Sequence, residues 1–374
     1  MSRASVGGSP GTADRQDATR QTILVAMSGG VDSSVAAARL VAAGHRVIGA
    51  TMKTFCYSER PTNSRTCCGV EGIMDARMVC GRLGIPHYLF DMEEAFTRDV
   101  IDDFVSEYAA GRTPNPCVRC NSNTKIPDLL RRGRALGADA IATGHYASLE
   151  RTDTEWRLLR GVDRSKDQSY FLWGLPQDVL PFLRFPLGAL SKTEVRAEAR
   201  ALGLVTADKP ESQDICFVPT GDYTELLAQR LGEAHPGLNP GVMVGADGER
   251  LGEHAGYARY TVGQRRGLGG GSAVPLYVLG VRPERNEVVV GTAQQLDRED
   301  VELRDLNWLT TPPIVGERVM VQVRHRASAV PARVGRIDGA RARLDFESAQ
   351  RAITPGQSGA IYRDAVLVGG GRIA

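Results

Sequence analysis

A closely spaced pair of cysteines has the residue types and spacing of a chemically active site. Cys117 and Cys120 form a CxxC motif within GRTPNPCVRCN, residues 111–121. Two prolines with an asparagine between them oppose regular structure, which predicts a stiff loop. Arg112 and Arg119 are expected to lower the pKa of both thiols, and only a thiolate is an effective nucleophile or metal ligand. Alone, the motif fits half of a zinc site, a redox pair or part of an iron–sulfur site.

The other cysteines narrow these alternatives only in part. No second CxxC and no histidine pair follows at a spacing that would complete a zinc site. A third candidate thiol, Cys216, lies near the end of ESQDICF, residues 211–217. Cys80 lies in an amphipathic pattern and is expected to be a core residue. Two incidental loop cysteines at the CxxC motif remain the alternative to a functional pair.

A glycine-rich loop offers a second kind of chemistry. SGGVDSS, residues 28–34, lies between a short apolar run and an alanine-rich stretch. In a strand, loop and helix of this kind, backbone N–H groups and the helix dipole can hold a phosphate. Asp32 is suited to orienting Mg²⁺, because its carboxylate would otherwise repel phosphate. The loop matches neither the Walker A pattern nor GxGxxG, and an ordinary glycine turn is the alternative.

The elements around this loop predict an α/β domain that positions both sites. Apolar runs alternate with helical patterns, which is typical of a parallel sheet covered by helices. The predicted strands are residues 22–27, 46–51, 87–90 and 138–143, and the predicted helices are residues 35–43, 73–83, 93–110 and 126–136. Further helices are predicted at residues 169–175, 192–202 and 223–231, and from Pro240 onward short alternating runs predict mainly β structure.

Composition limits the class of protein. The chain has 374 residues, 42% of them hydrophobic, and a net charge of +2, which is too small to indicate a nucleic-acid partner by itself. Seven cysteines are too few, and odd in number, for a secreted disulfide scaffold. No apolar run approaches the roughly 20 residues that span a bilayer. These features predict a cytoplasmic protein without a membrane partner, and residues 1–20 read as a disordered leader.

One local basic cluster could serve RNA or form an ordinary solvated helix face. It holds six cations against the single acid Asp128, namely Arg112, Arg119, Lys125, Arg131, Arg132 and Arg134.

Seven blocks in order resemble the bacterial tRNA-specific 2-thiouridylase (MnmA) family of the ATP pyrophosphatase superfamily. SGGVDSS alone indicates only the superfamily, which also contains synthetases. The blocks are SGGVDSS, GRTPNPCVRCN, ATGHYA (142–147), KDQSYFL (166–172), ESQDICF, TVGQRRGLG (261–269) and TPGQSG (354–359). The resemblance covers the chain from Thr22 onward.

This resemblance implies an α/β fold in which a parallel-sheet ATP pyrophosphatase domain precedes a small central domain and a C-terminal β-barrel. The implied ranges are 1–20 for the leader, 21–217 for the catalytic domain, 218–291 for the central domain and 292–374 for the barrel. The implied reaction is ATP-dependent 2-thiolation of the wobble uridine, position 34 of tRNA. It passes through an adenylated base, uses sulfur carried on cysteine, and releases AMP and pyrophosphate.

Residue roles follow from matching positions. Cys120 would be the nucleophile and Cys216 the persulfide carrier, with a disulfide between them after transfer. Some family members have aspartate at the position of Cys117, so a general-base role is not carried over. The implied ATP contacts are Ala26, Met27, Ser28, Gly29, Gly30, Val31, Asp32, Ser33, Met52 and Gly144. The implied tRNA contacts are Asn115, Pro116, Cys117, His145, Lys166, Asp167, Gln168, Arg324, His325 and Gln357.

The implied cofactors are ATP and Mg²⁺, and the implied partners are tRNAs of the Lys, Glu and Gln type and a cysteine desulfurase or sulfur-relay protein. Cys117, Cys120 and Cys216 could instead ligate a [4Fe–4S] cluster that binds external sulfide. Two rival interpretations remain. A synthetase that joins a small amine to an adenylate would need neither Cys120 nor Cys216, and a noncatalytic iron–sulfur or RNA-binding protein would not turn over ATP.

Overall fold

Five parallel strands form the first sheet, in the order β3-β2-β1-β4-β7. In this computed structural model the described residues are 20–54, 70–210, 215–218, 221–268 and 274–374. The strands are β1 (Thr22–Ala26), β2 (Arg46–Lys53), β3 (His87–Asp91), β4 (Ala140–Ala142) and β7 (Leu183–Arg184). Nearly all of the leader, together with Cys56, Cys67, Cys68 and residues 211–214 of ESQDICF, lies outside the described part.

Both faces of this sheet are covered, as buried parallel strands require. Ile23 and Val25 face the cluster that contains Val35 of α1, whereas Leu24 faces the cluster that contains Ile126 and Leu129 of α6. The covering helices are α1 (Val31–Ala42), α2 (Val70–Leu83), α6 (Ile126–Ala135) and α7 (Lys192–Ala201). The predicted α/β fold is confirmed.

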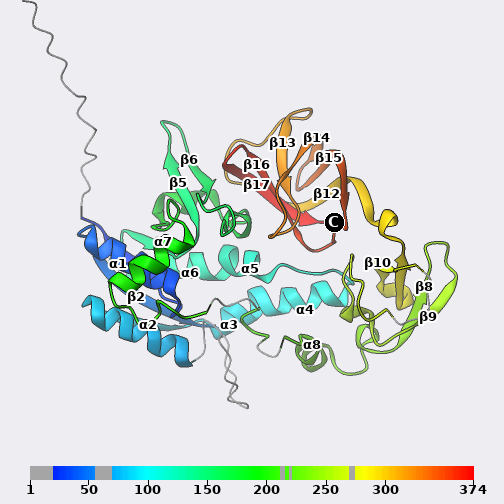
Figure 1. Cartoon of the computed structure of the whole chain (residues 1–374), viewed down its shortest axis with the longest axis horizontal. Helices are drawn as coiled ribbons and strands as arrows, with labels where there is room; N and C mark the ends of the chain where they lie inside the picture. The colour runs from blue at the N-terminus through cyan, green and yellow to red at the C-terminus, as the bar shows by residue number, and fades with distance from the viewer. Residues whose placement is uncertain (1–19, 55–69, 211–214, 219–220, 269–273) are drawn as a thin grey trace, which may run out of the picture.

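A long helical run leads away from the sheet beneath the barrel (Figure 1). It comprises α3 (Glu93–Phe96), the π-helical η1 (Thr97–Ile101) and α4 (Asp102–Ala109), and the chain then returns through α5 (Pro116–Arg119) and the π-helical η2 (Cys120–Lys125) into α6. The predicted loop at the CxxC motif is therefore wrong. Pro116 occupies the first helical position, where its missing N–H has no partner to lose, and Asn115 precedes it with non-helical φ of −112°.

The central region has a small sheet in the order β10-β11-β8-β9, packed with α8 against α4. Its elements are α8 (Thr224–Leu231), β8 (Gly241–Val244), β9 (Arg250–His254), β10 (Tyr277–Arg282) and β11 (Glu287–Gly291). Short 3₁₀ turns lie at η3 (Ser169–Phe171), η4 (Gln177–Phe182), η5 (Pro236–Leu238), η6 (Tyr257–Arg259), η7 (Pro283–Arg285) and η8 (Ala293–Leu296).

Six antiparallel strands close into the C-terminal barrel through pairing of β12 with β17. They are β12 (Asp297–Trp308), β13 (Arg318–Gln322), β14 (Val330–Asp338), β15 (Arg341–Arg351), β16 (Ser358–Arg363) and β17 (Val366–Ile373). A hairpin from the first half of the chain, β5 (Ala147–Arg151) and β6 (Trp156–Arg160), joins the same sheet because β6 pairs with β17. The barrel is confirmed, whereas the predicted domain boundaries stay a prediction.

No helix in the described part of the chain combines the length and apolar character that a membrane crossing requires.

Candidate active site

The serines of the glycine-rich loop fold it back on itself. Ser33 Oγ lies 3.2 Å from both the amide nitrogen and the Oγ of Ser28, and it donates to the Gly30 carbonyl oxygen at 3.1 Å. Gly29 has φ of +70°, and a Cβ there would lie 2.1 Å from the Gly72 carbonyl oxygen. Helix α1 begins without a side-chain cap from any described residue. The amides of its first turn therefore suit an anion.

Asp32 is held by two groups from distant parts of the chain. Lys192 Nζ lies 2.8 Å from each carboxylate oxygen, and the Tyr146 hydroxyl donates to Oδ1 at 2.8 Å. Sequence reasoning missed Lys192 and Tyr146. The signal for Lys192 was its place in the first turn of α7, where a cation opposes the helix dipole. A lysine at this unfavourable helix position indicates a carboxylate partner in another part of the chain.

Gly144 joins the phosphate loop to the end of β4. A Cβ at this position would lie 2.8 Å from both the Asp32 carbonyl carbon and the Ser33 amide nitrogen. Only glycine therefore lets the turn after β4 lie directly on the first turn of α1. Of the other predicted ATP residues, Ala26, Met27 and Val31 are buried around the loop, and Met52 is half-buried on β2.

Cys117 and His145 both lie within range of the charge of Lys125. The Cys117 side chain is open to solvent, yet protein surrounds it closely enough that burial raises the pKa of its thiol. His145 Nδ1 lies 2.8 Å from Thr143 Oγ1, and burial followed by the charge of Lys125 holds the pKa of His145 well below 6.5. Lys125 is also the charge that opposes the rise at Cys117. A side chain that is solvent-accessible but closely surrounded lies in a concave site.

The predicted lowering of the Cys117 pKa by neighbouring arginines is wrong. Arg112 pairs with Glu107 at 2.8 Å, and Arg119 Nε lies 3.4 Å from Asp103. Both guanidinium groups are thus committed to carboxylates and do little to stabilise a Cys117 thiolate.

Cys120 and Cys216 are half-buried and pack against one apolar cluster, which also contains Phe96 and Phe217. The structure therefore places both predicted sulfur-transfer residues on the same surface. Cys80 is 1% exposed, and burial raises the pKa of its thiol to about 11, which confirms its expected core position.

The three candidate cluster ligands do not fit a metal in this conformation. Among the described residues, no three His, Cys, Asp or Glu side chains gather closely enough to hold one.

Within the KDQ stretch, Asp167 is buried, whereas Lys166 and Gln168 are half-buried. Asp167 is 7% exposed, and its carboxylate accepts from Arg160, from the amide of Gly161 and from Ser169. A direct contact between Asp167 and tRNA fits this geometry poorly, because the Asp167 carboxylate is enclosed by protein and has the same sign of charge as the phosphates. Half-buried Gln168 accepts from the Tyr146 amide at 3.0 Å, which supports the turn above the phosphate loop.

Two of the predicted tRNA residues, Arg324 and His325, lie just after β13 of the barrel. Exposed Arg324 donates to the Arg351 carbonyl oxygen at 2.9 Å, and the His325 ring lies 4.4 Å from that of Phe171 between centroids. Burial lowers the pKa of His325, and the nearby Arg326 charge acts in the same direction.

Three regions of the chain meet at the segment before the CxxC helix. The Gln357 side chain donates to the carbonyl oxygens of Thr113 at 2.9 Å and Pro114 at 3.1 Å, and the Thr113 amide donates to Pro355. Thr113 Oγ1 also lies 3.0 Å from Thr261 Oγ1 of the central region. A cavity of about 470 Å³ opens at this junction and includes Arg324 in its wall. The barrel and the central region therefore jointly fix the approach to Cys117.

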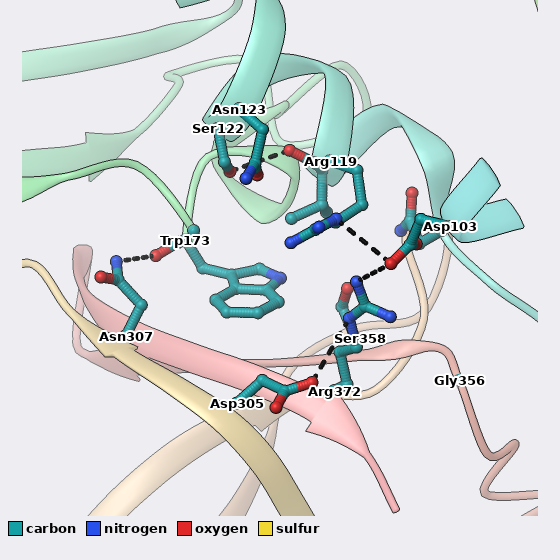
Figure 2. A pocket seen from close by; sticks show the side chains of 13 residues that line it. Asp103, Arg119, Ser122, Asn123, Trp173, Asp305, Asn307, Gly356, Ser358 and Arg372 are labelled. Carbon is teal, nitrogen blue, oxygen red and sulfur yellow. Dashed lines mark hydrogen bonds and ion pairs between the residues drawn. The ribbon is translucent and has the colours of Figure 1, made fainter. Parts of the chain in front are cut away.

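Ion pairs also tie helix α4 to the barrel. Glu107, nearly buried, accepts from Arg112 and from Arg304 of β12. Figure 2 shows Arg372 of β17 between Asp103 and Asp305, beside a cavity of about 190 Å³. Burial alone would raise the pKa of Glu107, but the arginines outweigh it and hold that pKa below its usual range.

The predicted basic cluster does not form one patch. Besides Arg112 and Arg119, Arg131 pairs with Asp128, Arg132 lies over Phe90 and Arg134 over Phe182. Among the described residues, Lys125 is the cation of this set without a hydrogen bond, an ion pair or a ring contact.

A parallel sheet, a glycine loop at a helix N-terminus and an appended barrel define an ATP-using α/β enzyme of the HUP class. Residues 21–220 match the family model "tRNA methyl transferase HUP domain", residues 225–292 match "tRNA methyl transferase PRC-barrel domain", and residues 298–373 match "Aminomethyltransferase beta-barrel domain".

Full-length relatives identify the family. The chain is 48% identical to "tRNA-specific 2-thiouridylase MnmA" of Acidithiobacillus ferrooxidans over 354 residues, which is 94% of this chain and 97% of that protein. It is 46% identical to the protein of the same name from Carboxydothermus hydrogenoformans, over 95% of this chain and 98% of that one. The chain belongs to the tRNA-specific 2-thiouridylase MnmA family, which confirms the resemblance and sets aside both rival interpretations.

A solved 4-thiouridine synthetase–RNA complex with bound ATP is a distant likeness. It shares 16% identity over 57% of this chain and 51% of that one, with a TM-score of 0.34.

Proposed function

We propose that this chain catalyses ATP-dependent 2-thiolation of the wobble uridine of tRNA. The observation that carries the proposal is that the turn after β4 connects the phosphate loop with the region around Cys117. Gly144 packs against the phosphate loop. The next residue is His145, and the charge of Lys125 acts to lower the pKa of both His145 and Cys117. A nucleotide on the loop would thus present its α-phosphate toward the recess that contains the thiol.

In the first step the uracil C2 oxygen attacks the α-phosphorus of ATP, and pyrophosphate leaves. The loop amides, Ser28 and Ser33 would stabilise the departing pyrophosphate, and preorganised donors of this kind supply several kcal/mol. Lys192 lies beside the same loop and would add a positive charge. Met52 would border the adenine, and the remaining ATP contacts are those of residues 26–33 and Gly144.

Asp32 would hold Mg²⁺. Its carboxylate already accepts a cation, the Lys192 ammonium, at 2.8 Å beside the loop, so the donor fits. When bound, Mg²⁺ would neutralise charge on the phosphates.

In the second step sulfur replaces the activated oxygen. The terminal sulfur of a persulfide on Cys216 attacks C2, a C–S bond forms, and the C2–O bond breaks as AMP leaves. The Cys120 thiolate then attacks the Cys216 sulfur, releasing 2-thiouridine and forming a Cys120–Cys216 disulfide. An external thiol reduces the disulfide, and a cysteine desulfurase or sulfur-relay protein supplies the next persulfide. The shared apolar surface under Cys120 and Cys216 supports their pairing.

The tRNA would lie across all three regions. Asn115, Pro116, Cys117 and His145 would surround the flipped base, and Lys166, Gln168, Arg324, His325 and Gln357 would contact the anticodon arm. We infer wobble uridines of the Lys, Glu and Gln type as substrates and the cytoplasm as the location.

The decisive experiment incubates the chain with unmodified tRNA, ATP and a sulfide source, followed by mass analysis of the nucleosides. We expect one oxygen replaced by sulfur at the wobble uridine, with AMP and pyrophosphate as products that form only with tRNA. ADP as the product would overturn the assignment.

Three variants test the sulfur-transfer step, and Cys117→Asp separates the persulfide scheme from a cluster. Cys120→Ser and Cys216→Ser should each end thiolation and leave AMP formation intact, whereas Cys117→Asp should retain much of the activity. Anaerobic purification with iron quantitation is the control, because strict iron dependence would contradict the persulfide scheme and favour three-cysteine ligation.

A further inference from the structure

The chain that leads to Cys216 is bonded to the phosphate loop. Residues 204–210, here named the stem, connect α7 with the segment that carries Cys216. Thr206 is 0% exposed, and its hydroxyl donates to Ser34 Oγ at 3.0 Å. Ser34 belongs to SGGVDSS, is equally buried, and donates in turn to the Gly30 carbonyl oxygen at 2.8 Å. Two buried hydrogen bonds in series therefore join the stem to the backbone of the phosphate loop.

Helix α7 holds the same stem from a second side. Arg196 donates to the carbonyl oxygens of Ala207 at 2.8 Å and Lys209 at 3.2 Å. Lys192, which bonds Asp32 of the phosphate loop, lies four residues earlier, so the two side chains project from the same face of α7. One face of this helix thus contacts both the phosphate loop and the stem.

Helix α2 provides a third connection. Its Gly72 packs so closely on the phosphate loop that a Cβ on Gly29 would lie 2.1 Å from the Gly72 carbonyl oxygen. Lys209 of the stem forms an ion pair with Asp75 in the next turn of α2. Helix α1, which the phosphate loop opens, lies next to both α2 and α7 (Figure 1). The stem is therefore fixed to three elements that all contact the nucleotide loop.

The chain after Cys216 is fixed in a different place. Phe217 is buried, and its ring centroid lies 5.7 Å from that of Phe96 and 5.1 Å from that of Phe104. Cys120 packs against the same apolar cluster. The segment that carries Cys216 thus begins at the nucleotide loop and ends at the cluster beside Cys120.

We propose that Thr206 is a positioning residue for sulfur transfer, which sets the place of Cys216 relative to the bound nucleotide. This inference rests on the proposed function and adds a residue to it. The apolar cluster alone would align Cys216 with Cys120, whereas the sulfur must also reach the C2 carbon of a base that is bonded to AMP. The Thr206 hydroxyl supplies the second alignment, because it fixes the stem to the loop that binds the phosphates.

The test counts pyrophosphate released per 2-thiouridine formed, with unmodified tRNA, ATP and a sulfide source. Pyrophosphate reports the first step, and 2-thiouridine reports the second. Where sulfur transfer is slow, water hydrolyses the adenylated base to uridine and AMP, and the same base is then adenylated again. The unaltered chain should form the two products in equal amounts. Molecules that do not fold yield neither product, so a merely structural defect leaves the ratio unchanged.

Two substitutions at Thr206 separate its hydroxyl from its packing. Thr206→Val keeps the shape of the side chain and removes the hydroxyl. The ratio of pyrophosphate to 2-thiouridine should rise roughly threefold or more, since a misplacement of about 1 Å can slow a reaction by about 10²-fold. Thr206→Ser keeps the hydroxyl and should keep the ratio of the unaltered chain.

Two further variants complete the design. Thr310→Val is the matched control and should leave the ratio unchanged, because the Thr310 hydroxyl is buried and has no partner among the described residues. Arg196→Met removes the contact of α7 with the stem and should also raise the ratio.

The outcomes separate this inference from the proposed function. An unchanged ratio in Thr206→Val overturns the inference, as does an equal rise in Thr206→Ser or Thr310→Val. If Thr206→Val yields no folded protein, an unchanged ratio in Arg196→Met overturns it instead. Absence of 2-thiouridine from the reaction of the unaltered chain would overturn the proposed function itself.

Discussion

At the scale of single residues, Asp32 links the nucleotide loop to the rest of the fold. Its carboxylate joins Lys192 of α7 and Tyr146 after β4 to the first turn of α1. Replacing Asp32 by asparagine removes the negative charge and keeps the shape of the side chain, because the amide oxygen can still accept from Tyr146. The substitution therefore separates the electrostatic role of Asp32 from its role in packing.

We expect Asp32→Asn to lower tRNA-dependent AMP formation by about 10²-fold or more, since a cation-binding carboxylate and the orientation of Lys192 are both lost. Pyrophosphate release measures the effect. Asp128→Asn, at an exposed pair with Arg131, is the matched control and should retain full activity. Full activity of Asp32→Asn would contradict the role given to the carboxylate.

Stability should depend on pH through His145. Because burial holds the pKa of His145 well below 6.5 in the folded chain, the unfolded chain binds more protons once the pH falls below 6.5. Folding stability is therefore lost as the pH falls through that value, by at most about 1.4 kcal/mol per pH unit for one group.

Urea unfolding at about pH 7.5 and pH 5.5 measures this dependence, with the linkage principle fixing its sign. His145→Gln should show a smaller loss of stability between the two values than the unaltered chain. Equal losses would mean that other groups carry the dependence, among which half-buried His87 and buried His254 also have lowered pKa values.

At the scale of elements, the turn after β4 must touch the turn that opens α1. Gly144→Ala places a methyl group 2.8 Å from two backbone atoms, and neither can move without displacing the phosphate loop. We expect ATP binding to weaken by roughly tenfold or more, as overpacking against backbone commonly costs 1–3 kcal/mol. Gly81→Ala, on α2 with open space around its added Cβ, is the control and should bind ATP normally. Equilibrium dialysis distinguishes the two variants.

Much of this element framework could be predicted from sequence, because buried parallel strands and glycine-ended helices have strong local patterns. The CxxC segment could not. Pro114 and Pro116 opposed a helix in the pattern, but a proline at the first helical position costs no hydrogen bond. Lys192 and Tyr146 were missed for another reason: they reach Asp32 from far along the chain, and only the tertiary fold brings them there. Likewise, Arg119 next to Cys120 implied an activating charge until Asp103 was found to take it.

At the scale of the whole molecule, the barrel holds the segment that leads into α5. Gln357 donates to Thr113 and Pro114 just before α5, whereas exposed Arg324 borders the junction cavity. These two predicted tRNA contacts should therefore behave differently when truncated.

We expect Gln357→Ala to lower the thiolation rate more than the affinity for tRNA, because it loosens the approach to Cys117. Arg324→Ala should lower tRNA affinity and reduce the salt dependence of binding by roughly one unit of log–log slope per lost phosphate contact. Filter binding at several salt concentrations and single-turnover thiolation give both quantities. Identical profiles for the two variants would contradict a separate positioning role for Gln357.

The pairing of β6 with β17 has a consequence for biosynthesis. The β5–β6 hairpin leaves the ribosome long before β17, the strand that completes its sheet. Until then β6 presents an unpaired edge, which other nascent chains can recruit. Arg304 and Arg372, which neutralise Glu107 and Asp103, also arrive late. Translation that stops early would leave a nucleotide domain with an open edge at β6, and Glu107 and Asp103 would keep only their pairs with Arg112 and Arg119. The strand that covers the edge of β6 is therefore the last strand of the chain to be made, and the sheet is complete only when synthesis is.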